Sequence, residues 1–132
     1  MSEQETIDLI NKRFDLNLTL SKYEFNDYDA ENENYIVEIK NRRKFYDDKI
    51  IECVKLFKNY HNAELKEKSF LYIVTDEEGV YIFNISKNIS RIIESKIIKT
   101  LQPRNTDFDN NKKMVKYVYY LNKNLYTKIS LK

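Results

Sequence analysis

The spacing of apolar and polar residues divides the first third of the chain into one helix and a hairpin. Over residues 2–14 the apolar positions recur at helical intervals, which predicts an amphipathic helix. The pattern then changes to alternation over residues 16–29, which predicts one bent strand or two short strands. The segment Tyr35–Lys40 is rich in β-branched residues and follows a polar turn at Ala30–Asn34, so the two extended segments are predicted to pair as a hairpin.

Two later segments also show helical spacing. The first runs from Phe45 to about Asn62, where a wide apolar stripe suits a helix that packs on a sheet. Its members are Tyr46, Ile50, Val54, Phe57 and His61. The second runs from Ile89 to Leu101, and the only proline, Pro103, is expected to end it in a polar loop.

Strand-like segments occupy most of the remaining chain. Ser69–Thr75 and Val80–Ile85 are predicted to form a second hairpin, in which Gly79, the only glycine, is expected to adopt a positive φ angle. Two C-terminal segments, YVYYL and LYTKISL, are interpreted as closing strands, with helix as the alternative for the first. This order predicts a single α/β or α+β domain over residues 1–132, with helices flanking a mixed β-sheet.

Length and composition fit one compact domain. The 132 residues are 42% hydrophobic and 33% charged, and no apolar run approaches the roughly 18 to 20 residues that span a bilayer. The N-terminus carries acids where a secretory signal carries bases, so a cytoplasmic protein is expected, in the host cytoplasm if the protein is viral. The single cysteine, Cys53, excludes an internal disulfide and is interpreted as a buried, inert residue.

One segment, YDAENENYIVEIK, places two carboxylates and a lysine where they can meet. Residues two apart in a strand point to the same face, so Glu38 and Lys40 lie together while the hydrophobic residues between them point to the core. Asp27 and Asp29 share a face of the preceding strand, and neighbouring strands lie only about 5 Å apart. One of these two aspartates is therefore expected to approach Glu38.

Two converging carboxylates indicate a magnesium site, since Mg²⁺ prefers oxygen ligands and keeps several of its waters. Asp29 and Glu38 would hold the ion, with the Ile39 carbonyl as a further ligand. The ion would offset charge on a scissile phosphate and lower the pKa of a bound water. Lys40 would orient that water or help to deprotonate it.

The segment YDAENENYIVEIKNRRKFYDDKIIECVKLF resembles the active-site region of PD-(D/E)xK nucleases, the superfamily of restriction-endonuclease-like folds and archaeal Holliday-junction resolvases. In that superfamily a helix precedes a mixed sheet, the metal-binding aspartate and the Glu-x-Lys lie on adjacent strands, and a helix packs behind them. The sequence looks most like small, stand-alone phage-type members, over roughly residues 2–85. The resemblance assigns the motif aspartate to Asp29, its acid to Glu38 and its lysine to Lys40.

This resemblance implies a DNA endonuclease that requires Mg²⁺ or Mn²⁺ and leaves 5′-phosphate and 3′-hydroxyl ends. Tyr28 stands where the motif has its proline, and Asp27 is a rival of Asp29 for the metal. Members often add a glutamate from the first helix, a role open to Glu5 or Glu3. Glu5 is included in the predicted site, with completion of a helix-capping box as its alternative role.

Basic residues after the motif are candidate contacts for nucleic acid. A net charge of +2 gives little overall attraction, so the positions of the charges matter more than their sum. Arg42, Arg43 and Lys44 follow the motif directly and are expected to contact phosphates. Lys49, on the predicted second helix with Tyr46, is expected to face the same cleft.

Other functions are also candidates. One is a catalytically inactive nuclease-fold module for nucleic-acid binding or assembly, which predicts salt-sensitive DNA binding that needs no divalent metal. Another is RNA processing. The only histidine, His61, is interpreted as a partly buried structural residue, and no P-loop or zinc-spacing motif is present. Because one small domain carries one cleavage centre, cutting both strands of a duplex favours a homodimer.

Overall fold

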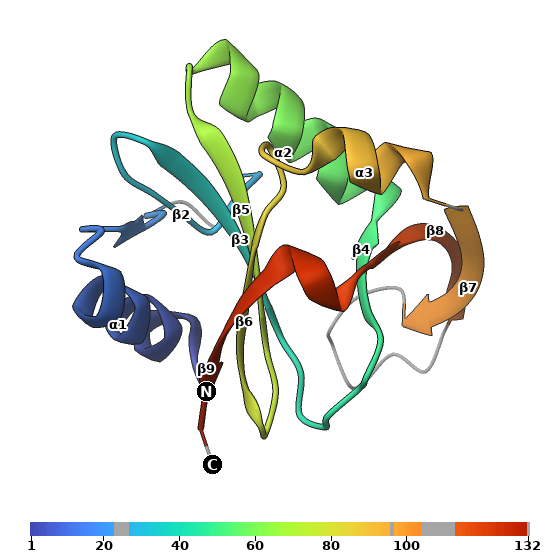
Figure 1. The fold of residues 1–132 in the computed structure, drawn as a ribbon, viewed down its shortest axis with the longest axis horizontal. Coiled ribbons are helices and arrows are strands. Elements are labelled where there is room, and N and C mark those ends of the chain that lie inside the picture. The colour runs from blue at the N-terminus through green and yellow to red at the C-terminus, as the bar shows by residue number, and fades with distance from the viewer. Residues whose placement is uncertain (23–26, 96, 104–112, 132) are drawn as a thin grey trace.

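The computed structural model describes residues 1–22, 27–95, 97–103 and 113–131. It is a mixed α+β structure in which helices flank a six-stranded sheet, and this confirms the predicted fold class (Figure 1). No helix within these described segments is long and apolar enough to cross a membrane. The elements in chain order are α1 (Glu3–Phe14), β1 (Thr19–Leu20), β2 (Ala30–Glu31), β3 (Tyr35–Asn41), β4 (Lys49–Glu52), α2 (Cys53–Leu65), β5 (Ser69–Thr75), β6 (Gly79–Asn84), α3 (Ile89–Glu94), β7 (Ile97–Pro103), β8 (Lys113–Leu121), a 3₁₀ turn η1 (Lys123–Leu125) and β9 (Tyr126–Ser130).

The main sheet has the strand order β1-β2-β3-β5-β6-β9. Strands β1, β2 and β3 are antiparallel, whereas β3 and β5 run parallel, with Glu38 opposite Tyr72. A parallel pair needs a crossover connection, which β4 and α2 supply. An antiparallel hairpin precedes α2 as predicted, but its first strand is shifted: β2 lies wholly inside the predicted turn Ala30–Asn34 and pairs with β3. Of the predicted alternating segment 16–29, Thr19–Leu20 forms β1, which pairs with β2, and Tyr23 and Phe25 lie outside the described residues. The second predicted hairpin is present as β5 and β6.

The central strand β3 is covered on both faces, which buries its alternating side chains. Val37 and Ile39 pack in a core cluster with the apolar residues of α1. Ile36 faces the other way, in a cluster with buried residues of α2 and β5. Glu38 and Lys40 share the face of Ile36 because side chains alternate along a strand. Both charged side chains therefore point toward α2, into a region that the fold partly closes to water.

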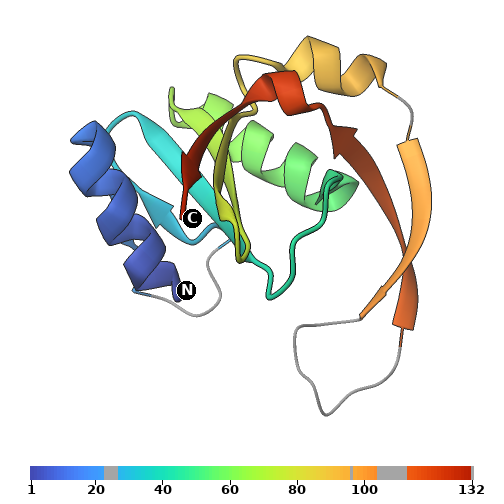
Figure 2. The same cartoon turned by 60° about the horizontal axis from the view of Figure 1, so that its bottom comes forward.

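A second, three-stranded sheet joins β4 to the β7–β8 hairpin in the order β4-β8-β7. Strand β4 pairs with β8 from Lys49 opposite Leu121 to Glu52 opposite Val118. The Tyr119 side chain is buried in the core beneath α2, which anchors this end of the hairpin. The other end extends away from the main sheet, as Figure 2 shows in orange and red. The two closing strands predicted at the C-terminus are thus present as β8 and β9, and the helical alternative is wrong.

The predicted helix over residues 45–62 is wrong in its first part and in the face it buries. The chain is extended as β4 at Lys49–Glu52 and becomes helical only at Cys53. Pairing with the distant strand β8 overrides the local helical spacing. Within α2, Val54 is 75% exposed and Phe57 is 45% exposed. The buried residues of this helix are instead Leu56, Asn59 and Ala63.

Two other residues of α2 are more exposed than predicted. His61 is exposed instead of partly buried, because it lies on the same outward face as the exposed apolar residues. Cys53 is half-buried at the start of the helix and packs against the core. Burial raises the pKa of its thiol, so the neutral and unreactive form is favoured.

Two expectations about the second half of the chain are also wrong. The helix predicted over residues 89–101 ends at Glu94, and Ile97–Pro103 forms β7 because these residues pair with β8. Gly79 does not have a positive φ angle. A Cβ atom at this position would lie 2.8 Å from the Ile129 carbonyl oxygen, so the close approach of β9 is what requires a glycine.

Candidate active site

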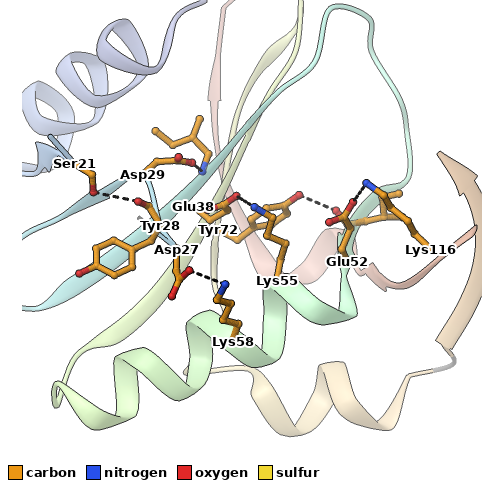
Figure 3. A network of polar contacts seen from close by, with 12 residues as sticks. Ser21, Asp27, Tyr28, Asp29, Glu38, Glu52, Lys55, Lys58, Tyr72 and Lys116 are labelled. Atoms are coloured by element: carbon orange, nitrogen blue, oxygen red, sulfur yellow. Dashed lines mark hydrogen bonds and ion pairs between the residues drawn. The ribbon is translucent and has the colours of Figure 1, made fainter. Parts of the chain in front are cut away.

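Asp29 is held against β3 immediately before β2 begins. Its backbone N–H donates to the Val37 carbonyl at 2.8 Å, and its carboxylate accepts a hydrogen bond from the Ile39 N–H at 2.7 Å. Alternate residues of a strand direct their backbone groups to the same edge, so the Ile39 carbonyl lies on the edge that Asp29 occupies. The structure thereby brings the Asp29 carboxylate beside that of Glu38 (Figure 3).

These two carboxylates are crowded in a partly buried setting. Burial, and then the negative charge of Asp29, raises the pKa of Glu38 to about 7. Burial also raises the pKa of Asp29, against the lowering effect of its hydrogen bond from Ile39. Removing water from a carboxylate disfavours its charged form, and a second carboxylate nearby adds repulsion. A bound cation would therefore stabilise this pair.

Helix α1 contributes Glu3 to this region, not Glu5. The Glu5 N–H donates to Ser2 Oγ at 3.1 Å and the Ser2 N–H donates to the Glu5 carboxylate at 3.3 Å, which completes a capping box. Burial and the charge of Asp29 raise the pKa of Glu3, and Glu3 in turn contributes to the raised pKa of Glu38. Glu5 thus caps the helix instead of joining the site, because its carboxylate is held beside Ser2.

The rival aspartate, Asp27, turns toward α2. Its carboxylate lies 2.6 Å from the Lys58 ammonium and accepts a hydrogen bond of 3.4 Å from the Asn62 side-chain amide. The hydrogen bond from Lys58 lowers the pKa of Asp27, whereas the pKa of Asp29 is raised. Of the two aspartates, Asp29 is the one that the fold brings to Glu38.

Lys55 of α2 contacts Glu38, and Lys40 shares the face of β3 that carries Glu38. Lys40 projects from the same face of β3, and burial, followed by the charge of Arg42, lowers the pKa of its ammonium. Lys55, in the first turn of α2, lies 3.1 Å from the Glu38 carboxylate. Lys55 was not predicted from the sequence, because a helix starting at Phe45 gave no reason to place it beside β3.

A second ion pair extends the site toward the β7–β8 hairpin. The Lys116 ammonium, from β8, lies 2.6 Å from the Glu52 carboxylate at the N-cap of α2. Glu52 raises the pKa of Lys40 and Lys116 lowers it, so this pair lies near Lys40. Tyr72 of β5 borders the same region and donates a hydrogen bond to the Ile50 carbonyl at 3.1 Å. The roles of Glu52 and Lys116 could not be predicted from the sequence, because the contact between them depends on the pairing of β4 with β8.

Three of the basic residues predicted to contact nucleic acid remain at the surface beside the site. Arg42 is half-buried, and its guanidinium lies 5.2 Å from the centre of the Tyr46 ring, a cation–π contact. The positive charge of Arg42 lowers the pKa of Lys40, which places Arg42 near the face of β3 that carries Glu38. Arg43 and Lys44 follow in an exposed loop. These side chains are accessible to a large anionic ligand.

Lys49 differs from the other predicted contacts because it is buried. Its side chain is 3% exposed, and its ammonium lies 3.3 Å from the Asp76 carboxylate. It also donates to the Tyr46 carbonyl and lies 4.1 Å from the centre of the Tyr81 ring. The predicted contact between Lys49 and phosphate is therefore wrong: the residue was assigned to a helix surface, whereas β4 directs it into the core.

The oxygen atoms at Asp29 and Glu38 fit a hard divalent cation. Within the segments that the structure describes, no three His, Cys, Asp or Glu side chains gather closely enough to hold a metal by themselves. Mg²⁺ typically binds one or two carboxylates and keeps several waters, so it does not need a larger side-chain cage. Asp29, Glu38 and the Ile39 carbonyl provide such a set.

The charged groups form a row that crosses the molecule from the start of β2 to β8 (Figure 3). In order along the row they are Asp29, Glu38, Lys55, Glu52 and Lys116. The chain matches no family model, and neither curated proteins nor solved structures give a match. Function is therefore inferred from the geometry and charges of this row.

The metal-free protein should lose stability as the pH rises from about 5 to about 7.5. Glu38 has a pKa of about 7 when folded, against an ordinary value of 4.5. Between these values the folded state binds more protons than the unfolded state, so a rise in pH favours unfolding. The difference corresponds to roughly 2–3 kcal/mol, and the raised pKa values of Asp29 and Glu3 act in the same direction.

Urea unfolding at several pH values in EDTA measures this effect. Asp27 and other acids with lowered pKa values titrate below this range and do not obscure it. The Glu38→Gln variant should show a much flatter profile. Adding Mg²⁺ at pH 7.5 should restore stability to the natural chain and much less to the variant. A flat profile in the natural chain would contradict the proposed crowding of the carboxylates.

Proposed function

We propose that the protein is a magnesium-dependent endonuclease that hydrolyses phosphodiester bonds in DNA. The observation that carries this proposal is the meeting of Asp29 and Glu38 on adjacent segments of the sheet, with Lys40 on the same face of β3. The surroundings support it, since α1 precedes a mixed sheet and α2 packs behind β3. This is the layout that the resemblance to PD-(D/E)xK nucleases implies. Mn²⁺ is expected to substitute for Mg²⁺.

Each side chain of the site has a distinct role in this proposal. Asp29, Glu38 and the Ile39 carbonyl hold the metal. When bound, the ion would lower the pKa of a coordinated water and offset charge on the scissile phosphate. Lys40, whose pKa is lowered by burial, has a larger neutral fraction than an exposed lysine and is suited to orient the attacking water or accept its proton.

Cationic side chains around the carboxylates support a polyanionic substrate. Lys55 and Lys116 approach from α2 and β8, and Arg42 approaches from the end of β3. Arg43 and Lys44 continue this basic surface into the adjoining loop. Several cations spread over a surface neutralise successive phosphates of a nucleic-acid backbone, which a small phosphomonoester does not offer. The preference for DNA over RNA follows from the family resemblance.

A cleavage assay with matched variants tests the proposal. The protein would be incubated with supercoiled, branched and single-stranded DNA, and with RNA, in Mg²⁺, Mn²⁺ or EDTA. Asp29→Asn should reduce metal-dependent cleavage by about 10²–10³-fold. Asp27→Asn makes the same change at the neighbouring aspartate, which pairs with Lys58, and should leave cleavage nearly unchanged. Absence of cleavage of every substrate, or full activity in Asp29→Asn, would overturn the proposal.

Lys55→Met should strengthen metal binding while weakening cleavage. The Lys55 ammonium contacts the carboxylate that is proposed to bind the metal, so the two cations compete for Glu38. Removing the lysine should tighten Mn²⁺ binding by roughly fivefold to tenfold, equivalent to about 1 kcal/mol of relieved competition. Cleavage should fall, because Lys55 is then lost as a partner for substrate phosphate.

Titration calorimetry with Mn²⁺ in the absence of DNA measures the first effect independently of activity. Lys58→Met is the matched control, since Lys58 is a lysine of the same helix that pairs with Asp27 instead of Glu38. It should alter Mn²⁺ affinity much less. Weaker Mn²⁺ binding in Lys55→Met would show that the lysine and the metal do not share a carboxylate.

A homodimer is part of the proposal for duplex substrates, because one chain provides one pair of metal-binding carboxylates. The outward face of α2 offers an apolar surface for such a contact, formed by Val54, Phe57 and Leu65. Light scattering with and without duplex DNA tests this association. A monomer that cuts both strands at the same position in one binding event would contradict it.

A second candidate is a catalytically inactive nuclease-fold module that binds nucleic acid. It is favoured by the two ion pairs that already neutralise Glu38 and Glu52 with lysines. Such a module should bind DNA in EDTA with strong dependence on salt, retain that binding in Glu38→Gln, and cleave none of the substrates.

A further inference from the structure

We infer, on the basis of the proposed function, that the β7–β8 hairpin forms a second wall of the substrate site and that Lys116 binds a backbone phosphate next to the one cleaved. The contact comes from a strand far along the chain from the segment that resembles PD-(D/E)xK nucleases. Its structural basis is the ion pair that holds the Lys116 ammonium 2.6 Å from Glu52, beside Lys40.

The anchoring of β8 fixes the position of Lys116. The neighbouring side chain Tyr119 is buried in the core, and its ring meets that of Phe57 of α2 edge-on at 6.2 Å between centres. The ladder between β4 and β8 ends with Glu52 opposite Val118. Lys116 lies two residues beyond Val118 on the same face of β8, so it points across the end of β4 toward Glu52. Packing of the hairpin base therefore determines where this charge lies.

From this base, the hairpin continues past the end of β4 as an arm. Within the described residues, β4 pairs with β8 only between Val118 and Leu121, whereas β7 pairs with β8 from Lys113 to Tyr119. The edge of β8 that faces the site is therefore not covered by β4 beyond Val118. Figure 2 shows the arm, in orange and red, standing away from the main sheet. Lys116 lies two residues beyond the last residue of β8 that pairs with β4.

Lys116 is open to a ligand on one side of its ion pair. The Lys116 and Glu52 side chains are 20% and 24% exposed, so water still reaches this partly buried pair. An ammonium group has three donors, and the ion pair with Glu52 needs only one of them, so others can meet a phosphate. With Lys55 and Arg42, this lysine places cations on several sides of the carboxylates. A nucleic-acid backbone that passes from Glu38 toward the arm would meet Lys55 first and then Lys116.

The salt dependence of DNA binding tests the contact. Full-length protein would be titrated into a fluorescent DNA duplex and a branched DNA in EDTA, over a series of salt concentrations. Lys116→Met should weaken binding by about fivefold to tenfold and reduce the slope of log K against log salt by about one. Lys116→Arg should preserve both. Lys123→Met removes another lysine that bridges two segments, by its ion pair with Asp47 at 2.8 Å, and should leave the slope unchanged.

The Glu52→Gln variant distinguishes a phosphate-binding role of Lys116 from a purely structural role of its ion pair with Glu52. If Lys116 binds phosphate, removing its competing carboxylate should maintain or strengthen DNA binding, whereas Lys116→Met weakens it. If the pair only holds the hairpin, both substitutions should lower the melting temperature and impair binding alike, which would overturn the inference. An unchanged salt slope in Lys116→Met would also overturn it, even if the natural chain cleaves DNA. A reduced slope without any cleavage would support the contact while rejecting the nuclease activity.

Discussion

Replacing Glu38 by glutamine should reduce metal-dependent cleavage of DNA on the order of 10³-fold while making the metal-free protein more stable at pH 8. Glutamine has nearly the same size and can still accept a hydrogen bond from Lys55, so the packing around position 38 is retained. It has no charge to balance a divalent ion, and only Asp29 would then hold the metal strongly. Activity should fall mainly in kcat, because the substitution removes stabilisation of the transition state.

The opposite change in stability follows from the burial of Glu38. The carboxylate side chain is 12% exposed and its pKa is raised, so at pH 8 the folded state carries a charge in an unfavourable place. Removing that charge should stabilise the fold by roughly 1–3 kcal/mol in EDTA. An increase in stability together with a loss of activity is typical of residues that function requires to be held in an unfavourable environment.

Glu31→Gln is the matched control for this substitution. Glu31 is an acid of the neighbouring strand β2, and its carboxylate lies 3.1 Å from Lys68 and 3.5 Å from Lys66. Glu31 has a lowered pKa, unlike Glu38, so its substitution should not stabilise the protein and should leave cleavage nearly unchanged. Cleavage by Glu38→Gln at the natural rate would remove Glu38 from the mechanism. A loss of stability in that variant at pH 8 would contradict the unfavourable burial.

The part of the site that could be predicted from the sequence depends on contacts between nearby residues. Glu38 and Lys40 share a face because side chains alternate in any strand, and this holds whatever the rest of the fold does. Asp29 meets Glu38 across a short turn, which is the simplest pairing available to two adjacent extended segments. The choice between Asp27 and Asp29 was not determined by this pattern, because it depends on Lys58 of α2.

The rest of the site depends on a strand pairing that local spacing cannot reveal. Residues 49–52 fit a helix in sequence, but pairing with β8 makes them a strand, and α2 then begins at Cys53. This shift alone places Lys55 against Glu38 and Glu52 at the helix N-cap. It also brings Lys116 to the site. Pairing between strands far apart in the chain thus positions Lys55, Glu52 and Lys116. Asp29 and Glu38, in contrast, meet through residues that are close in sequence.

The pairing of β4 with β8 also places Lys49 in the core. Substitution of Lys49 should have the largest effect on stability. Its partner Asp76 has a side chain with 0% exposure, and the Asp76 carboxylate also accepts hydrogen bonds from Glu78 and Gly79 N–H groups at 2.8 and 3.1 Å. Lys49→Ala would leave this carboxylate buried without its cation. Breaking a buried pair in this way typically costs about 3–5 kcal/mol. Urea unfolding should therefore show a large decrease in midpoint with little change in slope.

A double substitution distinguishes the loss of a charge partner from the loss of packing. Lys49→Met with Asp76→Asn removes both charges, keeps a long side chain beside Tyr81, and keeps an oxygen at position 76 for the turn N–H groups. It should be clearly more stable than Lys49→Ala, because no unpaired charge stays buried. Its DNA affinity and salt slope should match those of the natural chain, since Lys49 is enclosed by the core. Equal destabilisation in the two variants would show that packing by the lysine chain, and not its charge, holds β4 against the end of β5.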